Sequence, residues 1–178
     1  MKIFIVTVAV VILYSFTVVF FQDYRQSERS NYRVKYVCEE LSASAATFYD
    51  AEEYANGFEI FDTYQGIRAI EDQITHLLAF DSNGVPVSGS YWTGNLHYKA
   101  YFYDDSLEKK VYTDGSLTSE ESFSYPYSHF DDWTSCNKLI TSPTVVVTIN
   151  AGPGRYRLNF LDIIPDTVRT AAHVQEDR

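Results

Sequence analysis

One stretch decides the fold of this chain: Ile3–Phe21, IFIVTVAVVILYSFTVVFF, which is predominantly apolar and holds no charged residue. At ~1.5 Å per residue it makes roughly 28 Å of helix, close to the ~30 Å hydrocarbon core of a bilayer. Because backbone groups in lipid must satisfy their hydrogen bonds within the segment, we expect a membrane-spanning helix. A cleaved signal has a shorter apolar core and ends in small residues, whereas this stretch ends in Val-Val-Phe-Phe. We therefore predict a retained anchor over residues 1–22.

The same helix is predicted to continue beyond the membrane. No turn residue interrupts residues 22–49. Steps of three and four, typical of one buried helix face, separate the next apolar residues. These predicted helix-packing residues are Val34, Val37, Leu41, Ala45 and Phe48. The helix is expected to stop before Asn56-Gly57, a pair that favours the left-handed conformation found at helix ends.

Residues 23–178 have the length of one domain with a single core. A second helix is predicted over residues 64–80, where isoleucines and leucines form one stripe. Alternating β-forming residues predict strands at 58–61, 97–103, 109–113, 139–151, 155–161 and 168–174. Asp114-Gly115 is expected to be a hairpin turn, and residues 85–95 and 120–136 are expected to be loops. The predicted class is α+β: a long N-terminal membrane-spanning helix that continues as an amphipathic helix, then a second helix, packed on an antiparallel sheet.

Composition restricts the function and leaves the orientation open. The chain has 24 acidic against 14 basic residues and a formal charge of -10, which disfavours nucleic acid or anionic lipid as a partner of the whole domain. Most of the positive charge lies beside the predicted span or in the last predicted strands. Four cations between Arg25 and Lys35 follow the span and only Lys2 precedes it, which by the positive-inside rule places the domain in the cytoplasm. The acidic, Tyr-rich and Ser-rich body with two cysteines favours the outside. We expect an extracytoplasmic domain on a single-pass protein of the cell membrane or cell surface.

No pattern indicates catalysis, a metal or a cofactor, and we expect that the protein is not an enzyme. The four histidines fall on separate predicted elements without metal-ligand spacing. Asp104-Asp105 and Asp131-Asp132 do not lie in a calcium-loop pattern. Cys38 and Cys136 fit one disulfide better than a thiol nucleophile, because an exported context oxidises cysteine pairs.

This order of elements resembles the pilin-like superfamily, and among its members the Tad-type pseudopilins. The resemblance rests on residues 3–48, on the predicted hairpin at 144–161 and on the pairing of Cys38 with Cys136, and it covers the chain in outline. A leader ending in glycine and a glutamate inside the apolar stretch, both features of type IV prepilins, have no counterpart here, so no processing or assembly residue is transferred. The resemblance implies a structural or assembly subunit, a minor pilin or pseudopilin, of a cell-surface pilus or pilus-like secretion apparatus. Its partners would be the membrane and other copies or other pilin-like subunits.

A membrane-tethered extracellular binding module is the alternative hypothesis. Aromatic side chains in predicted loops would then form one face for a ligand or partner. The residues of this predicted face are Trp92, Tyr125, Tyr127, Phe130 and Trp133.

Overall fold

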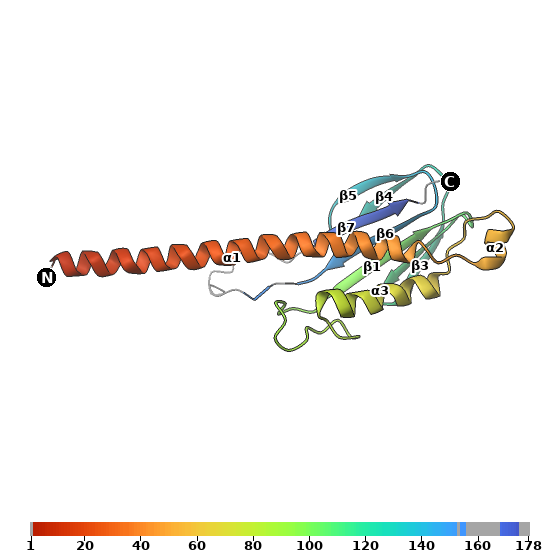
Figure 1. The fold of residues 1–178 in the computed structure, drawn as a ribbon. Coiled ribbons are helices and arrows are strands. Elements are labelled where there is room, and N and C mark those ends of the chain that lie inside the picture. Colours follow the sequence, from red (N-terminus) through yellow and green to blue (C-terminus); the bar gives the residue numbers. More distant parts are fainter. Residues whose placement is uncertain (1, 153, 156–167, 175–178) are drawn as a thin grey trace.

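The computed structural model describes residues 2–152, 154–155 and 168–174 (Figure 1). Its first element, α1 (Lys2–Ala45), is an unbroken helix of 44 residues. Figure 1 shows the first half of α1 as a rod that projects from the rest of the molecule, while the second half lies along the folded domain. Among the described residues, α1 is the one helix long and apolar enough to cross a membrane. The structure therefore confirms a long apolar N-terminal helix and the α+β class.

Two capped helices follow α1. The carboxylate of Asp50 accepts hydrogen bonds from the amides of Glu52 and Glu53 and begins α2 (Ala51–Ala55). Asp62 accepts from the amide of Gln65 and begins α3 (Thr63–Leu78), close to the predicted second helix. Between these helices the predicted strand at 58–61 is wrong. Only an isolated bridge from Tyr49 to Phe61 forms there, because no neighbouring strand pairs with the rest of the segment.

The main sheet has five strands in the order β3-β2-β1-β6-β7, and every neighbouring pair is antiparallel. Its members are β1 (His97–Tyr103), β2 (Glu108–Thr113), β3 (Ser116–Ser122), β6 (Thr144–Asn150) and β7 (Val168–Val174). The predicted strands at 97–103, 109–113 and 168–174 are confirmed. The hairpin turn is also confirmed, with positive φ angles of 47° at Asp114 and 79° at Gly115.

Farther along the chain, one loop prediction and one strand prediction are wrong, and another predicted strand lies largely outside the described residues. Residues 120–136 are not one long loop, because they contain the end of β3, all of β4 (Tyr127–Asp131) and the start of β5 (Cys136–Ile140). The predicted strand at 139–151 is two strands, β5 and β6, separated at Pro143, which has no amide hydrogen for a strand ladder. Most of the predicted strand at 155–161 falls in residues that the structure does not describe.

Both faces of the main sheet are covered. On one face, α1 and α3 pack with Phe102 of β1 and with Val145, Val147 and Ile149 of β6 in the larger core. On the other face, Tyr101, Tyr103 and Val146 pack with Ile140 in a second core beneath the two-stranded β4-β5 hairpin. Successive residues of β6 alternate between these cores. Burial on both faces explains why the strand reads as the continuous apolar run Val145-Val-Val-Thr-Ile149.

Four of the five side chains predicted to pack the helix lie in the larger core. Val34, Val37, Leu41 and Ala45 are buried, whereas Phe48 is half-buried and lies beyond the last residue of α1.

We predict that Leu41→Ala lowers the free energy of unfolding by about 2–5 kcal/mol, because it leaves a cavity in the larger core. Leu139→Ala is the matched control, since the Leu139 side chain is 62% exposed on β5, and it should change stability by less than ~0.5 kcal/mol. Denaturant unfolding of the full chain in detergent, followed by tryptophan fluorescence, measures both. Equal losses in the two variants would contradict the packing of α1 on the domain.

Candidate functional site

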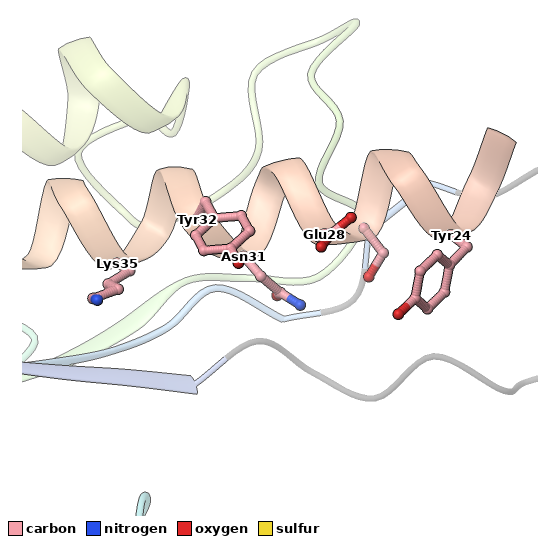
Figure 2. Close-up of a pocket in the computed structure, with 6 residues that line it drawn as sticks. Tyr24, Glu28, Asn31, Tyr32 and Lys35 are labelled. Carbon is pink, nitrogen blue, oxygen red and sulfur yellow. The ribbon is translucent and has the colours of Figure 1, made fainter. Parts of the chain in front are cut away.

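The segment of α1 that joins the apolar half to the domain, residues 22–36, is here called the neck. It borders a shallow hollow of about 320 Å³ lined by Tyr24, Ser27, Glu28, Asn31, Tyr32 and Lys35. Figure 2 shows that the side chains of Tyr24, Asn31 and Lys35 project to the same side of α1. Sites for small organic ligands are mostly apolar and enclosed, whereas this hollow is open and is lined by polar, charged and tyrosine side chains. The neck therefore fits contact with a surface better than capture of a small molecule.

The neck is tied to the domain on one side and exposed on the other. The guanidinium of Arg33 donates a hydrogen bond to the carbonyl of Leu77, the residue before the last of α3. Asp23 is only 5% exposed. On the outer side, Tyr32 and Tyr36 are 55% and 65% exposed, four residues apart on a rigid helix. Exposed tyrosines on a rigid element are typical of protein contact surfaces.

A buried histidine occupies the second core. His129 Nδ1 lies 2.8 Å from the hydroxyl oxygen of Tyr103, and the ring of Tyr101 meets the imidazole edge-on at 4.6 Å between centroids. Its Nε2 is buried without a hydrogen-bond partner in the described part of the chain. Burial lowers the pKa of His129; Asp131 opposes this effect, and the charges of Lys109 and Lys138 add to it. The neutral ring thus serves as a packing element beneath the β4-β5 hairpin.

A group of carboxylates gathers where α3, residues 81–84 and the β2-β3 turn meet around a hollow of about 260 Å³. Each of these carboxylates is already engaged in hydrogen bonds within the domain. Glu71 accepts a hydrogen bond from the hydroxyl of Tyr98, and Asp81 accepts from the amides of Asn83 and Val85. Asp114 accepts from the amide of Tyr98 and lies 2.8 Å from His97 Nδ1. Within the described ranges, no three His, Cys, Asp or Glu side chains are placed to hold a metal ion.

The predicted aromatic binding face does not assemble. Trp92 is 5% exposed in the larger core, stacked on Phe80. Tyr125 and Tyr127 are half-buried against the second core, on the opposite face of the sheet. Phe130 is exposed, and Trp133 lies under the ammonium of Lys99, whose Nζ is 4.5 Å from the ring centroid. The sheet separates Trp92 from the other four residues.

The predicted disulfide is not formed. Cys38 is a buried thiol that donates a hydrogen bond to the carbonyl oxygen of Val147 on β6, with Sγ and O 3.0 Å apart. The strand that begins at Cys136 belongs to the β4-β5 hairpin. That hairpin covers the opposite face of the main sheet, so the sheet lies between Cys38 and β5.

The outward residues of the neck were missed by the sequence reasoning, which followed only the buried stripe. The signal was available: Arg25, Arg29, Tyr32 and Tyr36 recur at steps of three and four on the side of the helix away from Val34.

Comparison with protein-family models, with curated proteins and with solved structures finds no match to this chain.

We predict that Cys38 is alkylated once the chain is unfolded without a reductant and is protected while the chain is folded, because its thiol is buried. Peptide mass mapping after treatment with iodoacetamide measures this. Recovery of a disulfide-linked peptide containing Cys38 would contradict the structure.

We predict that His129 makes stability depend on pH. The folded state resists protonation of this ring, while the unfolded chain binds the proton below about pH 6.5. The contribution of neutral His129 to the free energy of unfolding is complete above that pH. It is lost as the pH falls from there toward the lowered pKa of His129 in the folded state. The variant His129→Gln should lack this loss, whereas His76→Gln, which changes an exposed histidine of α3, should keep it. Denaturant unfolding across the range provides the test, and identical pH profiles of the wild type and His129→Gln would refute it.

Proposed function

We propose that this protein is a membrane-anchored structural subunit of a cell-surface assembly, either a pilus or a pilus-like secretion apparatus. One observation carries the proposal: α1 is continuous, its first half has no cover within the described structure, and its second half belongs to the core of the domain. So much exposed apolar surface requires an apolar environment. Lipid, or the helices of neighbouring subunits, can supply it.

The neck supports contact between copies. Within Ile3–Phe21 only Ala9 and Ser15 are small, so the close backbone approach that drives helix association in lipid is weakly encoded there. Tyr32 and Tyr36 lie beyond the apolar half, on the side of the helix that the domain leaves exposed. Tyrosine offers a large contact area at low cost in side-chain entropy. In this proposal these two side chains make the lateral contact with a neighbouring subunit.

The proposed topology places the domain outside the cytoplasm, with α1 as the single membrane span. The acidic composition supports this side, and the cations that follow the span oppose it. Treating intact cells with a protease separates the two orientations, because only an outside domain is digested without breaking the membrane.

We predict that Tyr36→Glu lowers the fraction of protein that co-sediments with sheared surface filaments by roughly tenfold, since a contact worth about 1.4 kcal/mol changes an equilibrium by that factor. Tyr64→Glu is the matched control, because Tyr64 is 70% exposed on α3, away from the neck. Unchanged tryptophan fluorescence would show that the domain of Tyr36→Glu is folded. A wild-type protein found only as a detergent-soluble monomer would overturn the proposed function.

A further inference from the structure

Two arginines of the neck have no protein partner in the described part of the chain. The sheet lysines Lys99, Lys109 and Lys110 each pair with a carboxylate. Arg25 and Arg29 are exposed and form no ion pair there, although the chain carries a formal charge of -10. Their counterions must therefore come from solvent or from groups other than the described residues of this chain.

Both arginines stand next to the bilayer if α1 spans it. The apolar stretch ends at Phe21 and α1 continues without a break, so the Cα atoms of Arg25 and Arg29 lie about 6 Å and 12 Å beyond it. Headgroups occupy roughly 5–8 Å on each side of the hydrocarbon core. Side chains of a helix lean toward its N-terminus, which here is the membrane side. Both guanidinium groups can therefore reach the plane of the lipid phosphates.

Within the described residues, no carboxylate forms an ion pair with either arginine. Asp23 is buried, and Glu28 is exposed at the hollow beside Asn31 and Lys35. No ion pair joins Glu28 to either arginine in the described structure. Arg25 and Arg29 are four residues apart and so occupy one side of the helix. Tyr24 adds an exposed aromatic ring at the same level, as is common at membrane interfaces.

We propose that Arg25 and Arg29 bind the headgroups of anionic lipids in the leaflet on the domain's side of the membrane. This inference rests on the membrane anchoring in the proposed function. A planar guanidinium forms paired hydrogen bonds with phosphate oxygens, and a net negative headgroup adds attraction that a zwitterionic one lacks. Because the neck is tied to α3 through Arg33, the bound lipids set the height of the whole domain above the membrane.

The full chain, reconstituted at one copy per nanodisc in phosphatidylcholine, provides the test. Electron paramagnetic resonance compares the association of spin-labelled phosphatidylglycerol with that of spin-labelled phosphatidylcholine. The wild type should prefer phosphatidylglycerol by up to about fivefold per arginine at low salt. The preference should shrink in 1 M salt, where the screening length is about 3 Å.

Charge variants distinguish lipid binding at Arg25 and Arg29 from non-specific attraction of anionic lipids to other cations of the chain. Arg25→Gln with Arg29→Gln should abolish the preference, and Arg25→Lys with Arg29→Lys should keep it. Arg68→Gln, which removes an exposed cation of α3, should leave it unchanged. A wild type without preference, or a double glutamine variant that retains it, would overturn the proposal.

Failure here is distinguishable from failure of the proposed function, because a single copy per nanodisc excludes contacts between subunits. Loss of co-sedimentation in the double glutamine variant with its lipid preference intact would assign the arginines to a protein partner, which also overturns the lipid proposal.

Discussion

The second half of α1 is held to the domain by a buried stripe that includes Val34, Val37 and Leu41. This stripe shares one core with Val145 and Val147 of β6, the strand next to the centre of the main sheet. The contact joins an apolar rod to a folded head without a flexible connection, because the helix is continuous from the exposed half to the buried half. Any force on the rod therefore reaches the domain directly.

The two faces of the sheet have different chemistry. The helix face is apolar, while the hairpin face buries His129 and Asp131 among tyrosines. Asp131 accepts hydrogen bonds from Thr134 and Thr148, and the latter connects the hairpin to β6. Polar groups buried in this way are directional, so they favour one seating of the hairpin on the sheet. Burial in the same arrangement lowers the pKa of His129.

Regular patterns made much of the fold predictable. The stripe of Ile67, Ile70 and Ile74 predicts α3, and the apolar run at residues 145–149 predicts β6. The strand β4 was missed although its residues alternate in burial, because the buried members are His129 and Asp131 and apolar periodicity cannot reveal them. Trp92 was predicted to lie on the surface because the segment around it has the composition of a loop. It lies in a segment without regular structure, yet that segment folds back and fills the core with its side chain.

The sequence by itself determined the projecting first half of α1, because a helix satisfies its backbone hydrogen bonds within the segment and the apolar stretch from Ile3 to Phe21 contains no helix-breaking residue. It also determined which side of α1 meets the domain, through the spacing of Val34, Val37 and Leu41. Only the tertiary structure decided which face of the sheet each distant residue occupies. It separated Cys38 from the strand that begins at Cys136, and Trp92 from Trp133. The physical reason is that strand pairing and sheet coverage depend on contacts between residues far apart in the chain, which no local period encodes.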